Sequence, residues 1–68
     1  MNSKSTKVCV IQGFTIAYCG DVPEGVVVGS TREEANKKAK RKWVWFEDDS
    51  KFGNCHYTVV QWHTIGRG

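Results

Sequence analysis

Three cysteines and two histidines are the residues of this 68-residue chain best suited to metal binding or nucleophilic chemistry: Cys9, Cys19, Cys55, His56 and His63. No two cysteines form a C-x-x-C pair, and the spacing of the five matches no common zinc site. The histidines are seven residues apart in one expected strand, so they should point to opposite faces. An odd number of cysteines also argues against a disulfide framework. We therefore predict reduced thiols that pack as small apolar side chains, with no metal and no other cofactor.

The chain contains no G-x-S-x-G, phosphate-loop or H-E-x-x-H motif. Asp48 and Asp49 are adjacent in sequence, which is typical of a solvated loop and not of a facing acid–base pair. A chain of this length also has little material with which to support a preorganised pocket. These observations predict a protein that is not an enzyme.

Length and composition predict a single small domain over residues 1–68, with frayed ends at 1–6 and 66–68. No run of apolar residues is longer than four, so no segment is expected to span a membrane. The polar residues 1–7 do not form a secretory signal. We therefore expect a cytoplasmic protein that makes no membrane contact.

Two strands are expected near the N-terminus. Residues 7–12 (KVCVIQ) are rich in β-branched side chains, and residues 14–19 (FTIAYC) alternate in polarity with the period of a half-buried strand. Gln12 and Gly13 lie between the two segments and predict the turn of a hairpin.

The rest of the sheet is expected to be discontinuous in sequence. Residues 20–25 (GDVPEG) indicate a loop, because they combine a proline with two glycines, and residues 26–28 form a very short third strand. A polar turn at 47–54 then leads to a long strand at 55–65. With the helix described next, the fold class is α+β: a small antiparallel sheet packed on one helix, in the order β-β-β-α-β.

One helix is predicted in the middle of the chain. Ser30 or Thr31 can cap it, since each is followed three residues later by a glutamate. We expect the helix to continue to about Trp43, after which 44–46 form either its last turn or an extended segment. Apolar residues that recur at i, i+4, i+8 and i+11 form one stripe facing the sheet, namely Ala35, Ala39, Trp43 and Phe46.

The basic residues are concentrated on this helix. Residues 30–42 hold six basic and two acidic side chains, a net charge of +4, whereas the whole chain has +3. The glutamates are expected to pair with the lysines four residues later, which leaves the charges at 40–42 uncompensated. Such a cluster is either a solvated face or a contact surface for acidic groups. The six residues are Arg32, Lys37, Lys38, Lys40, Arg41 and Lys42.

Aromatic residues are frequent for a chain this short, and most are expected in the core. Trp45 lies off the helical stripe, so we expect it to be exposed together with Phe52 and to anchor a partner.

The stretch DVPEGVVVGSTREEA (residues 21–35) resembles the core motif of HicB-type antitoxins. In that family a strand ends in Asp-x-Pro, a short strand follows, and Gly-x-Thr-x-Glu-Glu-Ala begins the helix. GFTI (residues 13–16) is similar to the family's Gly-aromatic-Val-Val segment, so the resemblance spans residues 13–40. The matching positions are Asp21, Pro23, Gly29, Thr31, Glu33, Glu34, Ala35 and Ala39.

The resemblance implies a bacterial or phage protein that binds and masks a small RNA-cleaving toxin in the cytoplasm. Members of the family usually have an acid-rich helix and a DNA-binding segment after the sheet. Here the helix is basic, and three residues follow the last expected strand.

Together these patterns predict a small non-catalytic protein that inhibits a partner. It would be an antitoxin-like blocker, or a phage-encoded inhibitor of a host enzyme or defence complex. The expected partner is a protein with an acidic surface, bound by the basic helix, by the edge strand around Val27 and by Trp45. The edge strand could also pair with a second copy to form a homodimer. The alternative is a nucleic-acid-binding accessory protein that uses the same helix.

Overall fold

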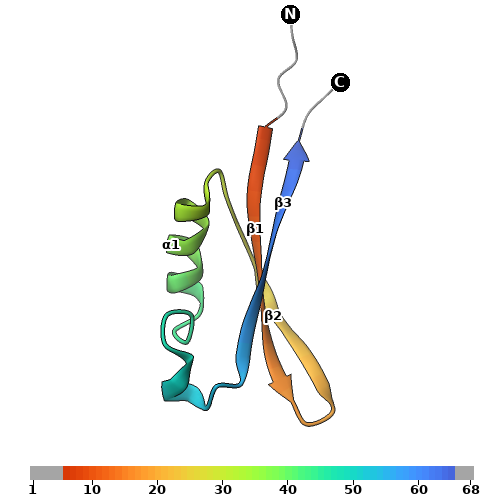
Figure 1. Cartoon of the computed structure of the whole chain (residues 1–68), viewed down its shortest axis with the longest axis vertical. Helices are drawn as coiled ribbons and strands as arrows, with labels where there is room; N and C mark the ends of the chain where they lie inside the picture. Colours follow the sequence, from red (N-terminus) through yellow and green to blue (C-terminus); the bar gives the residue numbers. More distant parts are fainter. Residues whose placement is uncertain (1–5, 66–68) are drawn as a thin grey trace, which may run out of the picture.

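The structure is a computed structural model that describes residues 6–65 of the chain (Figure 1). The strands form one antiparallel sheet of order β2-β1-β3, and the helix lies along one face of it (Figure 1). The predicted class, a small antiparallel sheet with one helix, is therefore confirmed. The elements are β1 (Thr6–Ala17), β2 (Gly20–Gly29), α1 (Arg32–Lys42), the short 3-10 helix η1 (Asp49–Phe52) and β3 (His56–Ile65).

The predicted order β-β-β-α-β is wrong, because only two strands precede the helix. The expected hairpin turn at Gln12 and Gly13 lies in the middle of β1. A Cβ atom on Gly13 would lie 2.7 Å from Cζ2 of Trp43, so this glycine is where an indole ring packs against the backbone. The hairpin turns instead at Tyr18 and Cys19.

The predicted loop at 20–25 belongs to β2 and is paired with β1. Pro23 is tolerated there because β2 is an edge strand, where a missing N–H need not break a ladder bond. Gly13 pairs with Gly25 and Phe14 with Pro23, so Glu24 is an extra residue at a β-bulge. Gly25 has a φ of +137°. The expected third strand at 26–28 is the last part of β2.

The predicted helix is confirmed, with Thr31 as its N-cap. The Glu34 backbone N–H donates to Oγ1 of Thr31 at 3.1 Å, and the Ser30 N–H donates to Oε1 of Glu34 at 3.0 Å. These hydrogen bonds satisfy donors at the helix start, and those from Ser30 lower the pKa of Glu34. The helix ends at Lys42, and residues 44–46 form a turn in which the Phe46 N–H donates to the Trp43 carbonyl.

The core lies between α1 and the inner face of the sheet. Ala35 and Ala39 are fully buried. A Cβ atom on Gly29 would lie 2.5 Å from the backbone nitrogen of Ala35, so glycine and alanine together allow the helix to approach β2 closely. Phe46 and Val60 pack against the core at its margin. Its buried members are Cys9, Ile11, Val27, Ala35, Ala39, Trp43 and Trp45.

The ends of the domain depart slightly from expectation. Thr6 was expected to be frayed but is the first residue of β1, paired with Ile65. The other frayed ends that the sequence predicts, 1–5 and 66–68, lie outside the described residues. Within residues 6–65, no helix has the length and hydrophobicity needed to cross a bilayer.

Substituting Gly13 with alanine tests the packing of Trp43 on β1. The added methyl group meets the indole ring, so we expect the free energy of unfolding to fall by about 1–3 kcal/mol. Urea denaturation followed by tryptophan fluorescence measures this change. Val44, which is 75% exposed, supplies a control, since Val44→Ala should stay within about 0.5 kcal/mol of wild type. Equal stability of Gly13→Ala and wild type would contradict the assignment.

Candidate functional site

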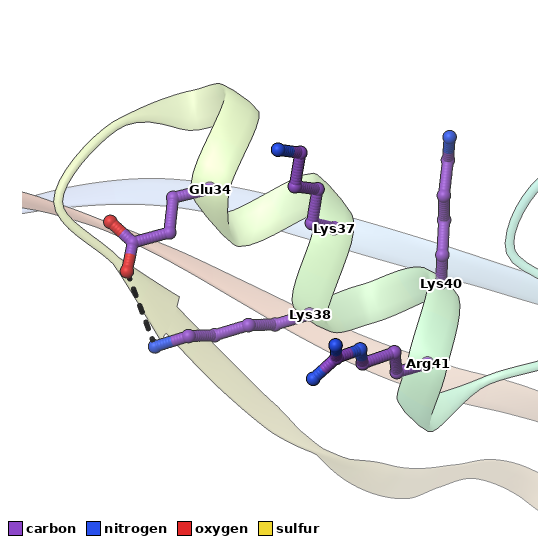
Figure 2. A pocket seen from close by; sticks show the side chains of 5 residues that line it. All are labelled: Glu34, Lys37, Lys38, Lys40 and Arg41. Carbon is purple, nitrogen blue, oxygen red and sulfur yellow. Dashed lines mark ion pairs between the residues drawn. The ribbon is translucent and has the colours of Figure 1, made fainter.

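The outer surface of α1 carries the charged side chains that the sequence singled out. Four basic residues and one glutamate line a shallow, open depression of about 410 Å³ on this surface: Glu34, Lys37, Lys38, Lys40 and Arg41 (Figure 2). All five come from one helix, so the geometry of α1 alone sets their spacing. Figure 2 shows Lys37 and Lys40 extending in one direction and Lys38 and Arg41 in another.

Lys38 is the most constrained of these basic side chains. Its ammonium nitrogen lies 3.6 Å from Oε2 of Glu34, which confirms one of the two predicted i, i+4 pairs (Figure 2). The same nitrogen donates to the backbone carbonyl of Val28 at 2.7 Å. Lys38 therefore ties α1 to β2.

Lys40 also has a partner, contrary to the expectation that residues 40–42 are uncompensated. Its ammonium group lies 3.0 Å from Oε2 of Glu47, in the segment that follows the helix. The chain turns back after Trp43, which brings this glutamate within reach, and helical spacing alone does not indicate the pair. The second predicted i, i+4 pair, Glu33 with Lys37, is not among the ion pairs of residues 6–65.

The basic residues at the two ends of α1, Arg32 and Lys42, make different contacts. Arg32 donates from Nε to Oδ1 of Asn36 at 3.2 Å. A Cβ atom on Gly25 would lie 2.6 Å from Cε of Lys42, so the aliphatic part of Lys42 covers the β2 backbone.

Lys37 and Arg41 are the remaining basic residues. Across the described range 6–65, neither forms an ion pair or a side-chain hydrogen bond. They are four residues apart on the helix, a spacing at which like charges destabilise it by about 0.2–0.5 kcal/mol. The depression on α1 thus offers two uncompensated cations held beside two compensated ones.

The structure contradicts the expected exposure of Trp45, and it also buries the side chain of Val27 in the edge strand β2. Trp45 is only 8% exposed and stacks on Trp43, with ring centroids 5.3 Å apart, and on His56 at 4.4 Å. The helix ends before Trp45, so the helical stripe does not determine its direction. Val27 is 8% exposed because its side chain faces α1. Neither side chain is available to a partner, whereas Phe52 is 42% exposed as expected.

A second polar cluster lies where η1 meets β3. Nδ1 of His56 lies 2.5 Å from Oδ1 of Asp49, and the His56 backbone N–H donates to Oδ2 of Asp49 at 2.9 Å. Burial raises the pKa of Asp49, but the hydrogen bonds from His56 outweigh it, and the pKa lies below its usual value. The sequence does not indicate this pair, because a seven-residue separation across an irregular turn has no periodic signal.

Cys55 lies beside this pair in an arrangement unlike a nucleophile–base–acid relay. Its Sγ is 3.7 Å from Nδ1 of His56, the same ring nitrogen that Asp49 contacts. A relay requires the nucleophile and the acid on different nitrogens. The Cys55 thiol also donates to the carbonyl of Phe52 at 3.2 Å.

The metal-ligating residue types are dispersed. His56 pairs with Thr15 and His63 with Val8, so the histidines lie on opposite faces, as predicted. In the part of the chain that the structure describes, no three His, Cys, Asp or Glu side chains lie close enough to hold a metal ion. All three cysteines are free: Cys9 is buried as expected and Cys55 half-buried, but Cys19 is exposed in the hairpin turn.

Comparison of the chain with protein-family models, with curated proteins and with solved structures finds no match. The functional interpretation therefore depends on the geometry of this chain.

Truncation of Trp45 distinguishes a core residue from a surface anchor. Because Trp45 is buried between Trp43 and His56, Trp45→Ala should lower the free energy of unfolding by about 3–5 kcal/mol. Thermal melts by circular dichroism measure the loss. Phe52→Ala is the control and should change stability by less than about 1 kcal/mol. Similar melts for the two variants would show that Trp45 is not part of the core.

Acid titration tests the pair of Asp49 and His56. A lowered pKa in the folded state means that the unfolded chain binds more protons, so stability rises with pH. The contribution of Asp49 is therefore complete above about pH 4 and is lost as the pH falls further. We expect Asp49→Asn to be less stable than wild type at pH 6 and to lose less stability between pH 6 and pH 3, as measured by urea denaturation. Glu33→Gln should match wild type, and parallel pH profiles for Asp49→Asn and wild type would contradict the assignment.

Proposed function

We propose that this protein is a non-catalytic binding protein that docks the outer surface of α1 on an acidic patch of a partner protein and blocks that partner. The observation that carries the proposal is the pair of uncompensated cations, Lys37 and Arg41, in a depression whose other two basic residues are paired with glutamates. A carboxylate on the partner would supply the missing counter-charge, and the guanidinium of Arg41 can bind it in a bidentate manner.

Local energetics support this interpretation. Lys37 and Arg41 repel each other on the free helix, and contact with acidic groups would remove the repulsion. Lys38 and Lys40 are held by Glu34 and Glu47, so their side chains lose less freedom on binding than unrestrained lysines do. The surface is thus partly preorganised for an acidic partner.

The resemblance of residues 13–40 to the HicB-type motif favours an antitoxin-like blocker within this class. The motif's helix-start residues here form the N-terminal cap of α1, and its Ala35 and Ala39 pack against the sheet. A phage-encoded inhibitor of a host enzyme or defence complex would use the same surface. In either role the protein acts by occupying a site, without chemistry of its own.

A nucleic-acid-binding accessory protein is the alternative function, and the basic character of the α1 surface favours it. Phosphates would satisfy the same cations. Proteins that bind single strands usually place exposed aromatic side chains among the basic ones, and here Trp43 and Trp45 are buried. A protein partner is therefore the preferred proposal.

The double variant Lys37→Glu with Arg41→Glu tests the docking surface. Reversing both charges should weaken binding to the acidic partner by about tenfold or more, since each side chain would then repel it. Tagged protein retains the partner from nuclease-treated bacterial lysate, and quantitative mass spectrometry compares the amount retained by each variant. Lys7→Glu, which removes an exposed lysine on β1, is the matched control and should retain as much partner as wild type.

The same experiment separates the two candidate functions. A stoichiometric protein that survives nuclease treatment and is lost in the double variant supports the blocker. Loss of the captured material on nuclease treatment, with steeply salt-dependent binding to random RNA or DNA, would support the accessory role instead. Equal capture of the partner by wild type and the double variant would show that the partner does not bind the outer surface of α1.

A further inference from the structure

The sheet has two edge strands, β2 and β3, because β1 lies between them. The edge formed by β2 is obstructed. Pro23 lacks an N–H, and Glu24 is the extra residue of a β-bulge. The carbonyl of Val28 already accepts a hydrogen bond from Lys38. Prolines, bulges and lysines are features that keep a further strand from adding to a sheet edge, so the β2 edge is protected.

The edge formed by β3 has none of these features. The ten residues of β3 (HYTVVQWHTI) include no proline and no lysine, arginine, aspartate or glutamate. The pairing of β3 with β1 runs from His56 to Ile65 without a register shift. β3 is therefore a regular edge that is long enough to accept a whole additional strand.

The backbone groups of β3 that point outward follow from one hydrogen bond. The Ile16 N–H donates to the Cys55 carbonyl at 2.7 Å, so Cys55 directs its backbone groups toward β1. Backbone groups alternate in direction along a strand, which turns those of residues 56, 58, 60, 62 and 64 outward. The His56 N–H already donates to Oδ2 of Asp49. Within residues 6–65, the outward groups at 58, 60, 62 and 64 have no hydrogen-bond partner.

β3 is only partly covered on the α1 side of the sheet. The buried residue Cys9 pairs with Trp62, so Trp62 lies on the same side of the sheet as α1. The helix packs mainly on β2 and β1. As a result Trp62 is 53% exposed, and Val60 is half-buried at the margin of the core. A half-exposed tryptophan beside unpaired backbone groups is typical of the residues that contribute most to an interface.

The flank of α1 that is turned toward β3 carries basic side chains. Lys38 reaches the carbonyl of Val28, so its flank of the helix faces β2. A helix rotates by about 100° per residue, so Asn36 and Lys40 each point about 200° away from Lys38, to the β3 side. Lys38 and Lys40 accordingly extend in different directions (Figure 2). Arg32 lies on the same flank as Asn36, since its Nε donates to Oδ1 of Asn36 at 3.2 Å.

The charge of this flank decides which kind of chain suits the edge. Antiparallel pairing of two β3 strands about a two-fold axis would place both α1 helices on one face of the joined sheet. Residues 30–42 carry a net charge of +4 in each copy, so a second copy gathers like charges. An extended segment with acidic side chains brings the opposite charge to the same face.

The other face of β3 favours a different kind of side chain. Side chains alternate between the faces of a strand, so Tyr57 and Val59 lie on the face opposite Trp62. There the ring of Tyr57 stacks on Phe14, with ring centroids 5.0 Å apart. β-Branched side chains pack well beside such neighbours. A complementary segment therefore alternates acidic with β-branched residues, which is itself the pattern of a strand.

We propose that the outer edge of β3 binds an extended segment of the acidic partner, which adds as a fourth strand with its acidic side chains toward α1. This inference rests on the proposed function only for the acidic character of the partner. Backbone hydrogen bonds to residues 58–64 supply affinity, and the charge of α1 selects the sequence of the segment. Lys40 borders both this flank and the depression on α1, so one partner can contact the two surfaces together.

Hydrogen exchange of backbone amides, followed by nuclear magnetic resonance on the whole chain, tests the proposal. The probe is an eight-residue peptide in which valine and glutamate alternate. Millimolar peptide should slow the exchange of the outward amides at residues 58, 60, 62 and 64 at least tenfold. Two control peptides should give no such protection: one of the same composition with like residues in blocks, and one with lysine in place of glutamate.

Three variants test the same contact through the affinity for the alternating peptide. Thr64→Pro removes one outward N–H near the end of β3, where an edge tolerates proline, and should weaken binding about fivefold. Thr64→Val keeps the N–H and the β-branched shape, so it is the matched control and should bind within about twofold of wild type. Trp62→Ala removes the exposed ring and should weaken binding about tenfold.

Absence of protection at residues 58–64 of the wild-type chain would overturn the proposal, as would equal protection by the lysine peptide. Chemical-shift changes at residues 37–41 in the same spectra report separately on the outer surface of α1, so the failure of this proposal is distinguishable from failure of the proposed function. Protection of the β3 amides without peptide, with a rise in mass from 7.7 kDa to twice that value in sedimentation, would assign the edge to a second copy and also overturn the proposal.

Discussion

The packing of the Trp43 indole on the backbone of Gly13 is the contact on which the rest of the structure depends. It occurs at the residue that caps the helix, so it fixes the end of α1 against the middle of β1. Trp45 and Phe46 then pack around the same ring. The indole N–H has no acceptor among the described residues, at a cost of about 1–3 kcal/mol. Burial of a tryptophan side chain offsets that cost in a chain with few other large core residues.

This constraint explains which parts of the fold the sequence could predict. The helix and its cap depend on Ser30, Thr31 and Glu34, which lie within five residues of one another, so local patterns were sufficient. Gly13 resembles a turn residue unless its tertiary neighbour, thirty positions away, is known. Pro23 resembles a loop residue unless β2 is known to be an edge strand. Gly13 and Pro23 are typical turn and loop residues by local sequence, but here tertiary packing places both in strands. The sequence alone does not predict that packing.

In the candidate site, too, local sequence predicts some features and tertiary contacts determine the others. The cluster of cations on α1 follows directly from composition, but their partners do not. Glu47 reaches Lys40 because the chain folds back after the helix, and Lys38 reaches the carbonyl of Val28 because glycine and alanine bring α1 close to β2. These contacts give two of the six basic residues a counter-charge and leave Lys37 and Arg41 as the unpaired cations of the depression on α1. Trp45 was misplaced for the same reason, since the helix that would have directed it outward ends before it.

We propose that the outer surface of α1 binds an acidic partner. Titration of the isotope-labelled protein with a glutamate-rich peptide, followed by backbone amide chemical shifts, tests this proposal most directly. The account predicts that shift changes are centred on residues 37–41 and weaken as salt is added. Shift changes centred on Val26 and Val28, or no change on the helix at millimolar peptide, would contradict it.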